Sequence, residues 1–215
     1  MKIQSITAAD LKMLRRTLTL ARRGGMATVP NPQVGAVIVH NGKILGEGYH
    51  QAAGEPHAEI NAIQNCKNKN LLKYATLYTN LEPCCHTQKR TPPCTTAIKK
   101  NGIKKIITIL RDPNPSVNGK GIQNLNGICL ETLQHTNTEQ KKIITEAQEL
   151  NKIFTKNMQE KRPFISLKLG MSLDGKIATE DGESQWITNS DARKYGHRLR
   201  TQHQAIMVGI NTIVR

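Results

Sequence analysis

A histidine, a glutamate and two cysteines stand at positions where they could perform hydrolytic chemistry. His57-Ala58-Glu59 is followed by Pro83-Cys84 and then by Pro93-Cys94. Catalytic zinc takes three protein ligands through nitrogen and sulfur and leaves a fourth position for water, so His57, Cys84 and Cys94 form a candidate ligand set. Zinc lowers the pKa of a bound water to about 7. Glu59 lies two residues after the histidine, so it points in a different direction and is free to act as general acid and base.

The spacing of the cysteines leaves two alternatives open. In the His-x-Glu and Pro-Cys-x-x-Cys pattern of zinc deaminases the second cysteine follows three residues after the first, whereas Cys94 follows ten residues after Cys84. Cys85 is a rival ligand, but we prefer Cys94 because adjacent side chains rarely converge on one tetrahedral ion. A purely structural zinc would use four protein ligands, with Cys85 or His86 as the fourth. Such a site would not need Glu59.

The composition limits the class of protein. The 31 Lys and Arg against 16 Asp and Glu give a net charge of +15, which first suggests a nucleic-acid partner. Aromatic residues make up only 3% of the chain and the basic residues form scattered pairs, so base stacking has few platforms. We interpret the charge as a solvated surface that also suits a phosphorylated small molecule. With 37% hydrophobic residues, the 215-residue chain can bury a core.

Targeting signals and disulfides are not indicated. No run of residues approaches the roughly 20 apolar positions that span a bilayer. The start, Met1 to Ser5, has no apolar signal-peptide core and leads into an amphipathic helical pattern. Five cysteines are an odd number, which argues against a disulfide framework. We therefore expect a cytoplasmic protein without a membrane partner, and a homo-oligomer stays open.

The hydrophobic pattern alternates between strands and helices. Thr7 and Asp10 form a capping box before a helical stripe that stops at Gly24-Gly25, and Asn41-Gly42 predicts a hairpin turn. The two prolines within 112–115 predict a loop. We expect strands at 34–39, 44–50, 75–79, 105–110 and 128–132, and helices at 11–21, 57–66, 95–100 and 139–150. This alternation predicts an α/β layered domain.

A change in composition predicts a domain boundary. Residues 156–162 are polar and charged and end at Pro163, after which 164–169 alternate like a new strand. We therefore divide the chain into a first domain at 1–148, a linker at 149–162 and a C-terminal part at 163–215. About 50 residues are near the lower limit for an independent fold, so we expect the C-terminal part to be incomplete.

Six motifs occur in order along the chain: Pro30–Gly35, Gly46–His50, Gly54–Glu59, Leu81–His86, Arg90–Cys94 and Asp112–Pro115. With them the chain resembles the bifunctional deaminase/reductase of bacterial riboflavin biosynthesis. Cytidine-deaminase-like proteins in general share only the His-x-Glu and Pro-Cys elements. The resemblance implies that 1–148 form a zinc-dependent deaminase domain with a three-layer α/β/α, cytidine-deaminase-like fold. The implied substrate is a phosphoribosylamino-diaminopyrimidinone, whose ring amino group is hydrolysed to give the aminouracil.

The resemblance also assigns roles to single residues. The family's zinc ligands and proton shuttle fall on the four residues derived above, and its substrate-binding positions fall on Asn31, His50, His86, Arg90 and Asn114. The two amides could read the donor and acceptor edge of a pyrimidine, and the other three match the side that holds the ribose phosphate. Turn chemistry for the asparagines, structural roles for the histidines and a solvated charge for the arginine are the alternatives.

The loop between the two cysteines departs from the family pattern. The family usually has a histidine, one further residue and then Gly-Lys/Arg-Thr-Pro-Pro-Cys. Here the segment from His86 to Thr91 has one residue more and no glycine. The sequence leaves open whether Lys89 or Arg90 meets the phosphate.

The C-terminal part resembles the opening of the family's NADPH-dependent reductase domain, an α/β domain similar to dihydrofolate reductase. The matching segments are Phe164–Gly170, Ser172–Lys176 and Gly182–Thr188, and no G-x-G-x-x-G dinucleotide motif is present. By resemblance, Gly170, Trp186 and Thr212 fall at cofactor positions, and Ser184 and Arg200 fall at substrate positions. A core role for the tryptophan is the alternative. The family continues well beyond the position of Arg215, so we expect this chain to lack a working reductase.

Two rival functions remain. A nucleic-acid deaminase that acts on adenosine or cytidine, of the tRNA type, would explain the charge of +15, but the long interval between Cys84 and Cys94 and the reductase-like tail argue against it. A non-catalytic, zinc-stabilised basic binding module would have no use for Glu59. The preferred prediction is therefore a Zn²⁺-dependent pyrimidine deaminase with a small phosphorylated substrate.

Overall fold

The computed structural model describes residues 6–87 and 91–214, and the chain divides into two compact units, Met1–Phe164 and Ile165–Arg215. The first unit contains a five-stranded sheet, and the second contains two helices joined to extended segments. Among the described residues, no helix combines the length and the apolar character needed to cross a bilayer. The five strands and four helices that the sequence predicts in the first unit are present, with ends shifted by up to three residues.

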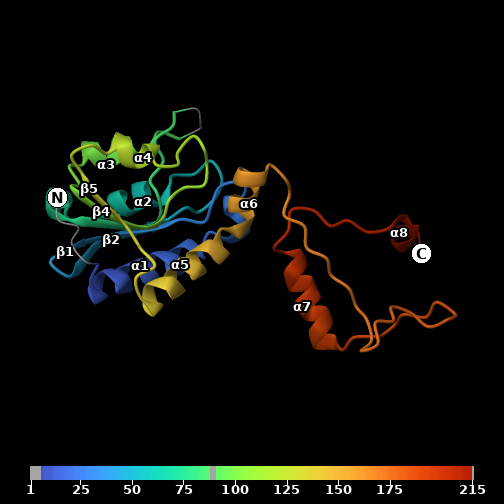
Figure 1. Ribbon diagram of the computed structural model, residues 1–215. Helices are drawn as coiled ribbons and strands as arrows, with labels where there is room; N and C mark the ends of the chain where they lie inside the picture. The colour runs from blue at the N-terminus through green and yellow to red at the C-terminus, as the bar shows by residue number, and fades with distance from the viewer. Residues whose placement is uncertain (1–5, 88–90, 215) are drawn as a thin grey trace. The chain divides into compact units, whose positions relative to one another are not determined.

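The sheet of the first unit is mixed, and its strand order is β2-β1-β3-β4-β5 (Figure 1). Its central strand β3 pairs with β1 in the antiparallel and with β4 in the parallel direction, and β4 pairs with β5 in parallel. The β1–β2 hairpin turns at Asn41 and Gly42, both at positive φ, as the Asn-Gly signal predicts. The strands are β1 (Gly35–His40), β2 (Lys43–Tyr49), β3 (Thr76–Leu81), β4 (Lys105–Leu110) and β5 (Cys129–Thr132).

Helices cover both faces of this sheet, which confirms the predicted three-layer α/β/α fold. On one face α1 (Ala8–Ala21) and α5 (Thr138–Leu150) pack over the odd-numbered side chains of β1, including Val37 and Val39. On the other face α2 (Ala58–Gln64) and α3 (Cys94–Lys100) pack over Ala36 and Ile38. Figure 1 shows the two helical layers on either side of the strands, with the short helix α4 (Lys120–Asn124) beside α3. The period-two alternation of β1 therefore divides the core into two layers.

Two local features fix the helices against the sheet. Asp10 accepts a hydrogen bond from the Thr7 backbone N–H at 2.8 Å, and its own N–H donates to the Thr7 hydroxyl at 3.2 Å, so the predicted capping box is confirmed. At Gly48 of β2, a Cβ atom would lie 2.4 Å from the backbone nitrogen of Ala62 in α2. Glycine at this position lets α2 approach the sheet closely, and the beginning of α2 carries the His-x-Glu motif.

Residues 149–162, assigned to a linker from the sequence, contain the end of α5 and the whole of α6 (Lys152–Glu160). Lys156 and Glu160 of α6 form an ion pair at 3.3 Å. Phe154 and Met158 on α6 are half-buried. The stretch for which the charged composition predicts a linker is therefore largely helical, and the apolar residues of α6 are partly shielded from solvent.

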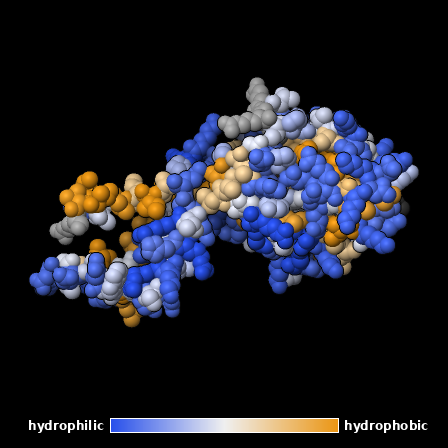
Figure 2. Space-filling model, turned by 180° about the vertical axis from the view of Figure 1, so that it is seen from behind, coloured by the Kyte–Doolittle hydropathy of each residue, from blue (hydrophilic) through white to orange (hydrophobic). Residues whose placement is uncertain are grey.

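The second unit contains α7 (Ser190–Arg200) and α8 (Ile210–Val214), and its described residues form no strand. The predicted strand at 164–169 is wrong: the segment carries no strand assignment, and Leu167 is 83% exposed. An alternating apolar segment becomes a strand only when a neighbouring strand accepts its backbone hydrogen bonds, and the described part of this unit offers none. Figure 2 shows apolar side chains of this unit at the surface.

Candidate active site

Three ligand atoms meet where β3, α2 and α3 begin or end. His57 is the N-cap of α2, Cys84 follows β3, and Cys94 is the first residue of α3. His57 Nδ1 lies 3.5 Å from Cys84 Sγ and 3.3 Å from Cys94 Sγ. A tetrahedral zinc with Zn–N near 2.0 Å and Zn–S near 2.3 Å would place nitrogen and sulfur about 3.5 Å apart. The donor set and its spacing therefore fit a zinc ion.

The orientation of His57 is supported from the other side of its ring. Thr91 Oγ1 lies 3.2 Å from His57 Nε2, so the threonine can hold the ring with Nδ1 facing the thiols.

Among the described residues the metal-ligating cluster consists of His57, Cys84 and Cys94. Cys85 lies outside this group, with its Sγ 3.9 Å from the Ser116 carbonyl oxygen. Burial raises the pKa of the Cys85 thiol, which disfavours the thiolate that a metal needs.

Glu59 projects from the first turn of α2 into the same cluster. Its side chain is 3% exposed, and its Oε2 accepts a hydrogen bond from the Cys94 thiol at 3.4 Å. Burial raises the pKa of Glu59, and the neighbouring Cys84 raises it further. A buried carboxyl beside the ligand cluster stands where a general acid and base could exchange protons with a bound water.

Asn31 presents its amide in an orientation that His50 fixes. His50 Nδ1 lies 3.2 Å from the Pro56 carbonyl oxygen, which can only accept, so Nδ1 carries the hydrogen of the neutral ring. His50 Nε2 then accepts from Asn31 Nδ2 at 3.0 Å. The Asn31 oxygen, an acceptor, is then the part of this amide that can bind a ligand in the cavity that Asn31 lines.

The loop that carries Asn31 is held by two buried amides. The backbone N–H of Gln33 donates to Asn151 Oδ1 at 2.8 Å. The Gln33 carbonyl accepts from Asn151 Nδ2 at 2.9 Å and from Asn80 Nδ2 at 3.0 Å. Since Asn151 is the residue between α5 and α6, these bonds also tie α6 to the loop.

Asn114 presents the opposite group. Its backbone N–H donates to Asp112 Oδ1 at 2.8 Å, and its Oδ1 accepts from the Ser116 N–H at 2.9 Å. The Asn114 Nδ2 donor is then the part of this amide that can bind a ligand. Asp112, which follows β4, is buried, and burial above all, with the charges of Glu82, Cys84 and Glu59, raises its pKa to about 7.

One cavity of about 480 Å³ collects most of these residues. This volume lies within the range of small-molecule sites. The predicted residues that line it are Asn31, His50, His57, Glu59, Cys84, His86 and Asn114, and Cys94 closes the metal cluster at its edge. Thr91, Asp112, Phe154 and Met158 also line the cavity and were not predicted from the sequence. Thr91 and Asp112 carried a signal, because they lie in the Arg90–Cys94 and Asp112–Pro115 motifs.

The remaining predicted residues are not part of this cavity's described lining. Arg90, and Lys89 with it, lies outside the described residues. Gly170, Ser184, Trp186, Arg200 and Thr212 belong to the second unit, where Gly170 is half-buried and the other four are exposed. Within that unit the guanidinium of Arg193 lies 4.1 Å from the centroid of the Trp186 ring, a cation–π contact.

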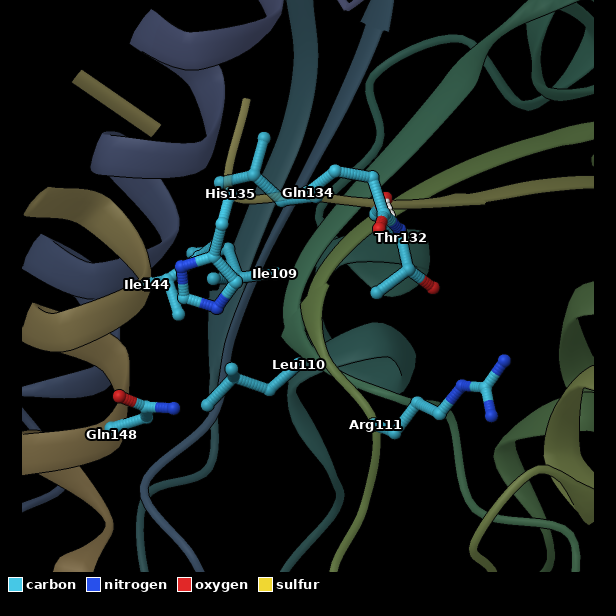
Figure 3. Close-up of a pocket in the computed structure, with 9 residues that line it drawn as sticks. Ile109, Leu110, Arg111, Thr132, Gln134, His135, Ile144 and Gln148 are labelled. Carbon is cyan, nitrogen blue, oxygen red and sulfur yellow. Dashed lines mark hydrogen bonds between the residues drawn. The ribbon is translucent and has the colours of Figure 1, made fainter. Parts of the chain in front are cut away.

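A second pocket, of about 300 Å³, lies at the ends of β4 and β5 beside α5. Figure 3 shows that Arg111 and His135 extend to opposite sides of it, with Leu110 between them. Because the two side chains point apart, they cannot hold one small ligand together. None of the residues predicted from the sequence lines this pocket.

A sheet between two helical layers carries a histidine, a buried glutamate and one cysteine at helix starts and a second cysteine after a strand. This is the arrangement of zinc-dependent nucleobase deaminases. The family model of the cytidine and deoxycytidylate deaminase zinc-binding region matches residues 7–110, and the first unit is a deaminase domain of this class. The RibD C-terminal domain matches residues 163–215. The chain belongs to the family of the riboflavin biosynthesis protein RibD, as its motifs predict.

Relatives support this assignment along nearly the whole chain. The riboflavin biosynthesis protein RibD of Aquifex aeolicus is 44% identical over 210 residues, covering 98% of this chain and 56% of the relative. RibD of Escherichia coli is 45% identical over 205 residues, covering 95% of this chain and 53% of the relative. The chain spans about half the length of the curated relatives that it matches.

Solved structures agree with the fold. RibD of Acinetobacter baumannii, form 2, superposes with a TM-score of 0.84 at 39% identity, covering 96% of this chain and 55% of that one. A diaminohydroxyphosphoribosylaminopyrimidine deaminase/5-amino-6-(5-phosphoribosylamino)uracil reductase from Thermotoga maritima superposes with a TM-score of 0.81 at 38% identity, covering 95% of this chain and 56% of that one.

Proposed function

We propose that this chain hydrolyses the ring amino group of a phosphoribosylamino-diaminopyrimidinone to give the aminouracil and ammonia. One water is consumed, a ring C–O bond forms and a ring C–N bond breaks. The observation that carries the proposal is the buried Glu59 carboxyl beside the His57, Cys84 and Cys94 cluster, inside a cavity lined by two amides. The Thermotoga maritima protein that superposes on this chain is named for this deamination.

In this proposal the cluster holds a zinc ion through His57 Nδ1, Cys84 Sγ and Cys94 Sγ. When bound, zinc lowers the pKa of a water ligand to about 7 and so supplies a nucleophile at neutral pH. Glu59 takes a proton from the attacking water and passes it to the departing amine. Its raised pKa suits both steps, because the carboxyl must be protonated in one half of the reaction and ionised in the other.

The two amides orient the ring. Asn31 offers its oxygen to a donor of the substrate, and Asn114 offers its Nδ2 hydrogens to an acceptor. A diaminopyrimidinone carries both kinds of group on its edge, so this pair selects one orientation in the cavity. His86 and Arg90 are proposed to meet the ribose phosphate, and His50 acts on the same ligand through Asn31.

We assign the second unit to the family's reductase part in the same proposal. Residues 163–215 would supply Gly170, Trp186 and Thr212 to an NADPH site, and Ser184 and Arg200 to the deaminated substrate. The match of these residues to the RibD C-terminal domain supports the assignment. The domain limits 1–148, 149–162 and 163–215 belong to this proposal.

Ammonia release from the phosphoribosylamino pyrimidine tests the deaminase function. Wild-type protein should turn the substrate over, and Glu59→Gln should lower kcat by about 10³-fold, because general acid–base catalysis contributes between 10² and 10⁴. Metal analysis should find about one zinc per chain, lost in His57→Ala. Equal turnover by wild type and Glu59→Gln would refute the assigned role. Glu131→Gln, a carboxyl on the edge strand β5 away from the cavity, serves as the control.

A further inference from the structure

Glu82 is a buried carboxylate that the proposed mechanism does not use. It follows directly after β3, and its side chain is 3% exposed. Its Oε2 accepts hydrogen bonds from the backbone N–H groups of Asp112 at 3.3 Å and Gly119 at 3.1 Å. Its Oε1 accepts from the N–H of Ile122 at 3.0 Å. Two backbone donors of the loop after β4 and one of α4 therefore converge on a single side chain.

The loop that Glu82 holds, residues 112–122, carries Asp112 and Asn114 into the cavity. The C-terminal end of residues 112–122 packs against Glu82 and Pro83. A Cβ atom on Gly121 would lie 2.3 Å from the Pro83 carbonyl oxygen and 2.8 Å from Glu82 Oε1. Both ends of the loop are thus fixed to the segment that also contains Cys84.

This arrangement links two parts of the site that lie far apart in sequence. Cys84 follows Glu82 by two residues and belongs to the metal-ligating cluster. Asn114 presents the donor amide to the cavity. Because the carboxylate joins the two segments through three hydrogen bonds, it sets where the amide stands relative to the cluster.

We propose that Glu82 is a positioning residue for the deamination: it holds the 112–122 loop so that Asn114 meets the substrate ring at a fixed distance from the His57, Cys84 and Cys94 cluster. The inference rests on the proposed function, since it concerns the substrate of that same cavity. Glu82 itself is not among the described residues that line the cavity. Its effect on the reaction is therefore exerted through the loop.

The charge of the side chain is essential to this role. An ionised carboxylate is acceptor-only, with lone pairs on both oxygens for the three donors. A glutamine has almost the same shape, but its NH₂ group would face backbone N–H groups at one of the two positions. Glu82→Gln should therefore release one side of the loop while leaving the packing in place.

A double-mutant cycle on the full chain tests the proposal. Glu82→Gln should lower kcat/KM for ammonia release about tenfold or more, with the zinc content unchanged. In the Asn114→Ala background the same substitution should cost less than about threefold, because the group it positions is already gone. Glu131→Gln, a matched carboxyl-to-amide change on β5 outside the cavity, should leave kcat/KM unchanged in both backgrounds.

A second variant covers the case in which Glu82→Gln does not fold. Gly121→Ala keeps the Glu82 side chain but pushes the 112–122 segment away from the Pro83 carbonyl oxygen and from Glu82 Oε1, and it should show the same loss of kcat/KM and the same dependence on Asn114. Full additivity with Asn114→Ala, or a lowered thermal midpoint with normal kcat/KM, would mean that Glu82 is merely structural and would overturn the proposal. If the wild type releases no ammonia from the pyrimidine, the proposed function fails, a result that is distinct from additivity in an active enzyme.

Discussion

Asp112 should make the stability of the first unit depend on pH in a direction that can be worked out. Its carboxyl is 6% exposed, and burial raises its pKa from the ordinary 3.8 to about 7. The folded protein therefore binds a proton that the unfolded chain has already released between about pH 4 and 7. Stability contributed by this group is present at low pH and is lost as the pH rises through 7. At about 1.4 kcal/mol for each tenfold change in proton affinity, the loss amounts to about 4 kcal/mol.

Asp112→Asn removes the charge but keeps an oxygen that can accept the Asn114 N–H bond. Urea unfolding of the chelator-treated proteins should be followed by circular dichroism between about pH 4.5 and 8. As the pH rises, the free energy of unfolding of the wild type should fall relative to that of the variant. The difference should change by up to about 1.4 kcal/mol per pH unit and level off above about pH 7. Asp181→Asn, at an exposed carboxyl of the second unit, should show no such difference. Parallel pH profiles for wild type and Asp112→Asn would refute the reasoning.

Three further predictions concern the ligands, the cavity wall and the core. Cys85→Ser should keep about one zinc per chain in metal analysis while Cys84→Ser loses it, and the opposite result would make Cys85 the ligand. Phe154→Ala should raise the KM for ammonia release about tenfold with zinc content unchanged, because it removes apolar surface from the cavity wall. An unchanged KM would mean that the Phe154 side chain does not contact the bound substrate. Tyr78→Phe removes the hydroxyl that donates to Asp10 at 2.6 Å, so it should cost about 2 kcal/mol in urea unfolding and leave kcat/KM unaltered.

Local signals account for most of the fold that the sequence predicts. The capping box at Thr7, the Asn41-Gly42 turn and the alternation of β1 each act over a few residues, so their structural result can be read from neighbouring positions. The grouping of His57 with Cys84 and Cys94 is different in kind, because it joins three elements. It could be predicted only because the chemistry of zinc requires those residue types to meet.

Contacts between distant segments were not predictable in this way. Phe154 and Met158 line the cavity from α6, a helix whose charged composition suggested a linker. The segment at 164–169 has the pattern of a strand, yet a strand also needs a pairing partner, and a pattern cannot supply one. Glu82 lies in the Leu81–His86 motif, but its contacts could not be predicted, because its hydrogen bonds go to backbone groups, which every sequence contains.

The distribution of charge gives the net value of +15 a new meaning. Among the described residues, the acidic side chains that are buried are Glu59, Glu82 and Asp112, and all three lie at or beside the cavity. Each negative charge makes it harder to ionise its neighbours: besides burial, the charges of Glu82, Cys84 and Glu59 raise the pKa of Asp112. A divalent cation among the thiols would offset that cost and would favour the ionised carboxyls. Cationic groups remain in excess on the surface, where they can attract an anionic substrate. In the proposed function, the basic surface would attract the phosphorylated substrate, and a metal ion held by the thiols would offset the negative charges of the interior.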